Sequence, residues 1–249
     1  MEPSKGIIDV WDRFDSIPVE TLTKAWYWSK KERDQQRSVV KMQANRQTYG
    51  CGGNSFDLSI WLVDEFTRAG YTAWAVGHHL FQENTAVAVI VEDDTGQYFC
   101  NIGRRWNKPA YIGKARGQES IKNNRAIAHG YEVSLWRDGD QLTITSINHI
   151  DLVEEEVFSL KKLDMVSLRE AAEFSQRQLV QPYVAVRTQW RGEFARWEFR
   201  DFTSCLMTEK ECVEEMPATS LDEWVERIHQ RTGMDRYVVR MALAVYRGL

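Results

Sequence analysis

The sequence predicts an α+β fold, with helices at both ends of the chain and antiparallel strands between them. Apolar residues recur at helical spacing before residue 70, alternate with a period of two in several later segments, and return to helical spacing beyond residue 220. The chain has 249 residues, 43% of them hydrophobic, which is enough to bury a large core. We therefore expect an N-terminal helical region with a buried helix at 1–70, a β-barrel or sheet region at 71–165, and strands with a closing helical lid at 166–249.

The clearest single element is the buried helix of the N-terminal region. Gly52 and Gly53 interrupt the polar helices that the first fifty residues predict. Asn54 then has the properties of an N-cap, and Asp57 stands three residues later, in the acidic position of a capping box. Residues 56–68 carry apolar side chains around most of a helix, so we expect this helix to be enclosed on nearly all sides.

After this helix the expected elements are short strands joined by turns. Residues 93–96, Asp-Asp-Thr-Gly, have the composition of a hairpin turn, and residues 103–125 are expected to form a loop. The strands that we expect are residues 71–80, 85–91, 97–102, 131–136, 141–147, 184–188, 194–199 and 204–207. The later helices that we expect are residues 167–178, 221–231 and 236–247, with Ser220 as the N-cap of the second.

The composition argues against several classes of function. The chain carries 36 acidic and 32 basic side chains, and this balance gives no reason to expect the strongly basic face that a nucleic-acid binder usually shows. No apolar stretch approaches the ~20 residues that span a membrane, and the polar N-terminus lacks the apolar core of a signal peptide, so we expect a cytoplasmic protein. The four cysteines are scattered and the histidines do not group with them, so we predict free thiols and no metal site.

The segment from Gly52 to Asp57, the helix after it and the hairpin that follows resemble the arylamine N-acetyltransferases. These belong to the wider group of papain- and transglutaminase-like proteins. In that family an Arg-Gly-Gly-x-Cys-x-Glu motif places a nucleophilic cysteine on the first turn of a buried helix. A histidine and an aspartate on two paired strands complete a Cys-His-Asp triad. The resemblance extends loosely over most of the chain and implies a central barrel and closing helices.

The three chemical positions of the motif hold different residues in this chain. With Gly52 and Gly53 fixing the frame, Ser55 stands where the family has its cysteine. Thr85 falls at the histidine position of the first hairpin strand, and Asn101 at the aspartate position of the return strand. Side chains alternate between the two faces of a strand, and Thr85 and Asn101 share the parity of the inward valines. We therefore expect Ser55, Thr85 and Asn101 to meet where a triad would stand.

These substitutions predict that the family's acyl transfer does not operate. The family mechanism, as the resemblance implies, passes the acyl group through a thioester on a thiolate that an imidazolium and a helix N-terminus stabilise. A serine hydroxyl requires a base within hydrogen-bond reach, and neither threonine nor asparagine can accept its proton. We predict a catalytically impaired protein that binds a ligand or a partner in the same cleft. It needs no cofactor, and its candidate ligands are acetyl-coenzyme A or coenzyme A, another acyl donor, or an arylamine-like molecule.

Two other classes of function stay open at this point. An active acyl-CoA-dependent N-acyltransferase, or a hydrolase, could use Ser55 or Cys51 as nucleophile with His78 or His79 as the base. A purely structural or oligomerising module is the third class, because a fold does not determine a function.

A basic pair follows the second hairpin strand. Arg104 and Arg105 stand where the family carries Gly-Phe-Gly and where its acyl donor approaches. Guanidinium groups bind phosphates well, so this pair is a candidate site for the phosphates of coenzyme A. The acidic run at residues 154–156 is expected to be a solvated surface segment.

Overall fold

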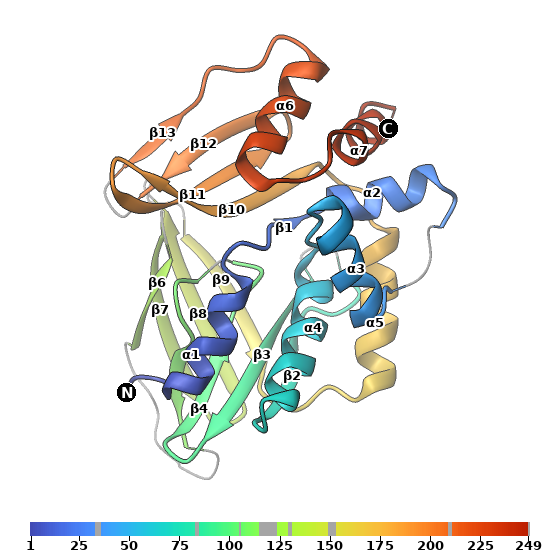
Figure 1. Cartoon of the computed structure of the whole chain (residues 1–249). Coiled ribbons are helices and arrows are strands. Elements are labelled where there is room, and N and C mark those ends of the chain that lie inside the picture. Colours follow the sequence, from blue (N-terminus) through green and yellow to red (C-terminus); the bar gives the residue numbers. More distant parts are fainter. Residues whose placement is uncertain are drawn as a thin grey trace.

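The computed structural model describes residues 1–32, 36–82, 85–104, 106–114, 124–128, 131–148, 153–208 and 211–248. The described residues form an eight-stranded sheet, a five-stranded sheet and seven α-helices, which confirms the predicted α+β class. In Figure 1 the larger sheet lies below the smaller one. The helices α3 (Val39–Tyr49), α4 (Ser55–Arg68) and α5 (Met165–Arg177) lie to its right, and α1 (Lys5–Trp11) lies in front of its strands. None of the described helices combines the length and the apolar character that crossing a bilayer demands.

The N-terminal segments form helices that cover one side of the larger sheet. The elements are α1 (Lys5–Trp11), a 3-10 turn (Asp12–Phe14), β1 (Val19–Glu20), α2 (Leu22–Ser29), α3 (Val39–Tyr49) and α4 (Ser55–Arg68). α4 is the buried helix that the sequence predicts. The Asn54 side chain accepts a hydrogen bond from Asp57 N, and the Asp57 carboxylate accepts one from Asn54 N, so the predicted capping box is confirmed.

The larger sheet is a nearly closed barrel. Its strands are β2 (Thr72–His78), β3 (Ala86–Asp93), β4 (Gly96–Cys100), β5 (Ala110–Gly113), β6 (Asn124–Ala128), β7 (Tyr131–Asp138), β8 (Gln141–Asn148) and β9 (Val153–Ser159). All pairings are antiparallel in the order β5-β4-β3-β2-β9-β8-β7-β6, and the edge strands β5 and β6 lie close to each other. α4 packs on β2 and β3, so β3 is buried on both faces rather than on one.

Three strands of the barrel, β5, β6 and β9, are absent from the prediction, and β6 begins at the end of the predicted loop. β5 lies inside residues 103–125, where the sequence predicts a loop, and it pairs with β4 through Phe99 and Ala110. β9 contains the acidic run at residues 154–156, which the sequence places on a solvated surface. It pairs with β8, and its Glu156 is 7% exposed. The prediction for this run is wrong because its carboxylates interrupt the apolar alternation that normally reveals a strand.

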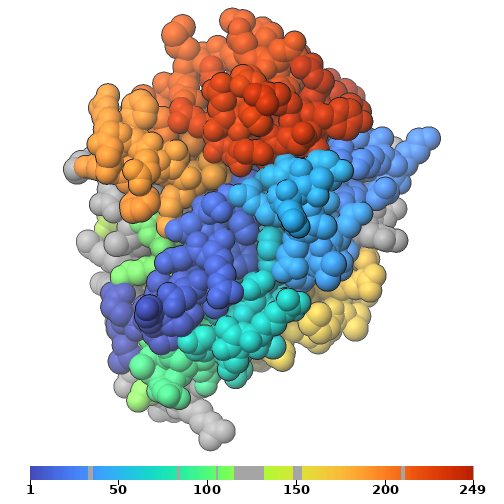
Figure 2. Space-filling view, viewed as in Figure 1, coloured from blue at the N-terminus to red at the C-terminus, as the bar shows by residue number. Residues whose placement is uncertain are grey.

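The C-terminal segments form the second sheet and its covering helices. The elements are α5 (Met165–Arg177), β10 (Tyr183–Trp190), β11 (Glu193–Arg200), β12 (Thr203–Met207), β13 (Cys212–Glu214), α6 (Leu221–Thr232) and α7 (Arg236–Arg247). The sheet order is β1-β10-β11-β12-β13, so β1 carries the N-terminal region into this sheet. In Figure 2 the C-terminal helices, in red, lie directly on the blue N-terminal helices, in keeping with the contact between α2 and α7. The boundaries of the three predicted regions stay a prediction.

Candidate functional site

A cavity of about 600 Å³ lies at the N-terminal end of α4, between the barrel and the smaller sheet. Ser55, Thr85 and Asn101, the three residues that the sequence predicts at triad positions, all contribute to its lining. Ser55 is the first residue of α4, Thr85 directly precedes β3, and Asn101 directly follows β4. The volume is in the usual range of small-molecule sites, roughly 300–1,000 Å³.

Gly52 and Gly53 lie just before the cavity at positions that have no room for a side chain. A Cβ atom at Gly52 would lie 1.8 Å from the carbonyl oxygen of Pro18. One at Gly53 would lie 2.6 Å from the Cβ atom of Asp57. Packed interiors do not tolerate contacts this short, so the glycine pair is what allows the backbone to pass Pro18 and enter α4.

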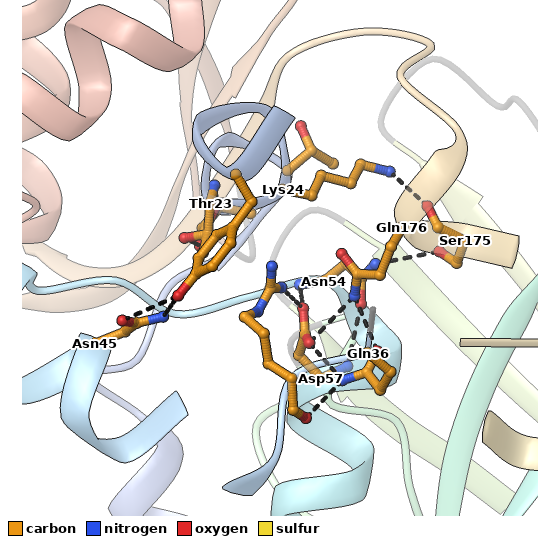
Figure 3. A network of polar contacts seen from close by, with 12 residues as sticks. Thr23, Lys24, Gln36, Asn45, Asn54, Asp57, Ser175 and Gln176 are labelled. Carbon is orange, nitrogen blue, oxygen red and sulfur yellow. Dashed lines mark hydrogen bonds and ion pairs between the residues drawn. The ribbon is translucent and has the colours of Figure 1, made fainter. Parts of the chain in front are cut away.

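Asp57, in the first turn of α4, is the centre of a buried polar network beside the cavity (Figure 3). Its carboxylate forms an ion pair with Arg37 and accepts hydrogen bonds from Gln36 Nε2 at 2.7 Å and Gln176 Nε2 at 3.2 Å. Gln36 and Arg37 precede α3 and Gln176 lies on α5, so one carboxylate joins three segments. The sequence identifies Asp57 but not these partners, because nothing in the polar stretch around Gln36 indicates burial.

Gly103 lies between Asn101 and Ser55, close to the side chains of both residues. A Cβ atom at Gly103 would lie 2.9 Å from Ser55 Cβ and 3.7 Å from Asn101 Oδ1. Asn101 Oδ1 accepts a hydrogen bond from Arg104 N at 3.1 Å, which orients the amide. Asn101 Nδ2 is buried and has no hydrogen-bond partner among the described residues. Asn101, which lines the cavity, therefore has one amide donor without a partner in the described residues.

The side chains of Thr85 and Ser55, like that of Asn101, carry no charge. Thr85 Oγ1 is buried and has no hydrogen-bond partner within the described residues. Ser55 lines the same cavity, and the described part of the chain contains no hydrogen bond from its hydroxyl to a histidine. Ser55, Thr85 and Asn101 thus offer hydroxyl and amide groups but no group that can take up a proton at neutral pH.

His78, at the end of β2, lines the cavity, whereas His79 is not part of the lining. The His78 ring is 5% exposed and stacks on the ring of His79, with 3.9 Å between centroids. His78 Nδ1 lies 2.8 Å from Val157 O and 3.1 Å from Val157 N, so the backbone of β9 engages this nitrogen in either tautomer. Their role as a base for Ser55 stays a prediction.

Cys51 stands apart from the cavity. Its side chain has no exposed surface, does not line the cavity, and packs in the hydrophobic core of the smaller sheet. Burial raises the pKa of the Cys51 thiol to about 12, and the nearby Glu20 adds to this effect. Such surroundings oppose the thiolate that a nucleophilic cysteine requires, which argues against Cys51 as the attacking group.

Arg104 lines the cavity but already has two acidic partners. Its guanidinium forms ion pairs with Glu154 at 2.8 Å and Glu156 at 3.2 Å, both on β9. Arg105, the second residue of the predicted anion site, lies outside the described residues. A binding role of this pair toward phosphate stays a prediction, and the glutamates that neutralise Arg104 weaken its support.

Two ionisable residues of the cavity wall, Lys24 on α2 and Glu20 on β1, are not predicted from the sequence. Lys24 is 8% exposed, and its Nζ atom donates a hydrogen bond to Ser175 O at 3.2 Å. Burial lowers the pKa of Lys24 to about 8. Glu20 is 1% exposed, accepts hydrogen bonds from the backbone and hydroxyl of Thr23, and has a pKa that burial raises. Lys24 and Glu20 both line the cavity.

Neither protein-family models nor curated protein sequences give a match to this chain. Solved arylamine N-acetyltransferases match it over nearly its whole length. The enzyme from M. tuberculosis gives a TM-score of 0.75 at 12% identity, over 100% of this chain and 94% of that one. A variant of the Mycobacterium smegmatis enzyme gives 0.72 at 16% identity, over 97% and 93%. The Mycobacterium marinum enzyme in complex with CoA gives 0.72 at 13%, over 99% and 95%.

These TM-scores show that the fold is that of the arylamine N-acetyltransferases, as the resemblance in the sequence predicts, and at such low identities they show the fold alone.

Proposed function

On this fold, we propose that the protein binds a small molecule in the cavity without transferring an acyl group. The observation that carries the proposal is that Ser55, Thr85 and Asn101 line one cavity and supply only neutral hydroxyl and amide groups. Two of their buried polar atoms, Thr85 Oγ1 and Asn101 Nδ2, have no partner in the described part of the protein. Buried polar atoms normally find a partner, so these two favour a ligand with complementary atoms.

Proton transfer is the step that Ser55, Thr85 and Asn101 cannot carry out by themselves. Loss of a general base alone lowers catalytic rates by roughly 10²–10⁴, and loss of the nucleophile as well leaves a triad enzyme near its residual rate. The helix N-terminus at Ser55 favours an anion but does not ionise a serine hydroxyl. We therefore expect the cleft to bind a ligand but not to catalyse acyl transfer.

Coenzyme A and its acyl thioesters are the first ligands to test. The Mycobacterium marinum enzyme, which has the same fold, is described in complex with CoA. This supports an acyl donor as a ligand of the present chain, although the glutamates that pair with Arg104 oppose added phosphate charge nearby. An arylamine-like ligand is the second candidate, and the predicted cytoplasmic location belongs to the same proposal.

Incubation with acetyl-coenzyme A tests the proposal. The wild type and Ser55→Ala are compared by intact mass and by the release of free coenzyme A thiol. We expect no acetyl adduct on either protein and equal, background release of thiol. Titration calorimetry with coenzyme A then measures binding without chemistry.

One outcome would overturn the proposal and favour the active alternative. This is an acetyl adduct, or thiol release above background, that the wild type shows and Ser55→Ala lacks. A His78→Gln variant would then establish whether that histidine is the base.

A further inference from the structure

Lys24 gives the cavity a cation that the family motif does not assign. The side chain extends from α2 toward α5, where Nζ donates to the carbonyl oxygen of Ser175 (Figure 3). It forms no ion pair with any residue in the described ranges. An ammonium group has three N–H donors, so the bond to Ser175 leaves donors for a further acceptor.

The other basic side chains of the described lining have acidic partners. Arg104 is paired with two glutamates of β9. Arg196 and Arg200 both bind the carboxylate of Glu198, at 2.5 Å and 3.0 Å. Among the lysines and arginines of the described lining, Lys24 alone forms no ion pair.

Two neutral side chains of the cavity lining, those of Asn101 and Thr85, also contain a polar atom without a hydrogen-bond partner in the described residues. Asn101 is 3% exposed, and its Nδ2 atom can only donate. The Thr85 hydroxyl is equally without a partner in the described residues and can donate or accept. A ligand that satisfies these groups together with Lys24 must carry oxygen acceptors and a negative charge.

We propose that the cavity is a monocarboxylate site, in which the Lys24 ammonium pairs with the ligand's carboxylate while Asn101 and Thr85 hydrogen-bond to its polar atoms. This inference rests on the proposed binding function, and it favours a carboxylate ligand over the phosphate-bearing coenzyme A. The carboxylate compensates an ammonium that burial otherwise disfavours.

The charge of the lining favours one negative charge over several. Glu20, Glu154, Glu155 and Glu156 also line the cavity. A phosphate group would bring additional negative charge toward these side chains, whereas a single carboxylate matches the one uncompensated lysine. Val19, Val87 and Val180 give the same cavity apolar surface for the body of an organic acid.

Titration calorimetry with hexanoate, hexanamide and inorganic phosphate tests this site. The proteins are the wild type, Lys24→Met, Lys24→Arg and Lys161→Met, the last a control at an exposed lysine between β9 and α5. Charged hydrogen bonds are strong enough that we expect hexanoate to bind Lys24→Met at least about tenfold more weakly than the wild type. Lys161→Met should match the wild type, Lys24→Arg should bind better than Lys24→Met, and hexanamide and phosphate should bind more weakly than hexanoate.

Binding of hexanoate to Lys24→Met with wild-type affinity would overturn the carboxylate site, as would stronger binding of phosphate or no binding of hexanoate to the wild type. A second readout is the side-chain amide resonance of Asn101, which we expect to shift when hexanoate is added to the wild type. An unchanged resonance contradicts the role of Asn101. These failures are distinct from failure of the proposed function, which is an acetyl adduct on the wild type.

Discussion

Replacing Lys24 with methionine should stabilise the protein at neutral pH, although it removes a hydrogen bond. The Lys24 side chain is 8% exposed, and burial lowers its pKa from 10.5 to about 8. The charges of Asp57 and Glu20 oppose this shift and that of Arg37 adds to it, but desolvation is the largest cause. Keeping the ammonium inside the folded protein therefore costs free energy that a methionine of similar length avoids.

The size of this effect follows from the pKa. A difference of one pKa unit corresponds to about 1.36 kcal/mol, so a shift from 10.5 to about 8 corresponds to about 3 kcal/mol. The unfolded chain binds the proton more tightly than the folded protein between these two values, so this contribution to stability rises with pH through that window. The penalty is complete below about pH 8 and falls to about 1 kcal/mol at pH 10.

Urea unfolding of the wild type and Lys24→Met at pH 7 and pH 10 measures the difference. We expect the variant to gain up to about 3 kcal/mol at pH 7, reduced by the lost bond to Ser175, and about 2 kcal/mol less at pH 10. The matched control is Lys161→Met, which makes the same substitution at an exposed lysine outside the cavity lining. A difference between wild type and Lys24→Met that is equal at both pH values would refute the reasoning.

Three further predictions concern the surroundings of the cavity. Gly103→Ala should lower the melting temperature, because the new Cβ atom would lie 2.9 Å from Ser55 Cβ, and overpacking of this kind costs about 1–3 kcal/mol; an unchanged melting temperature contradicts the close approach. Asp57→Asn should lower the free energy of unfolding in urea by about 3–5 kcal/mol, because it leaves the buried Arg37 guanidinium without its anion; Asp222→Asn, at an exposed ion pair, serves as the control. Cys51 should resist a thiol reagent in the folded protein, since it has no exposed surface and a pKa of about 12, and rapid labelling in a peptide-mass experiment would disprove this.

The sequence predicts the elements whose signals are local. The capping box of Asn54 and Asp57 and the apolar periodicity after it are sufficient to place α4 from the order of the residues alone. The glycine pair sets the frame of the motif, and this frame brings Ser55 to the same cavity as Thr85 and Asn101. The placing of α4 succeeds because it depends on residues that are close in the sequence, whereas the triad positions stay a prediction.

What the sequence does not reveal depends on partners far along the chain. The sequence does not reveal β9 because its glutamates resemble a surface segment. Only Glu156 is buried, and its ion pair with Arg104, about fifty residues earlier, compensates its charge. From the sequence, Lys24 resembles a solvated lysine on a short helix. In the structure, its ammonium group donates a hydrogen bond to the carbonyl oxygen of Ser175 on α5. Spacing alone contains no information on either contact.

The central claim is that the cavity binds but does not transfer acyl groups because its triad positions cannot move a proton. Its most direct test compares the wild type with a triple variant, Ser55→Cys, Thr85→His and Asn101→Asp, after incubation of each with acetyl-coenzyme A. We predict one acetyl group on the residue-55 peptide of the triple variant and none on that of the wild type. Acetylation of the wild type at Ser55 would contradict the claim.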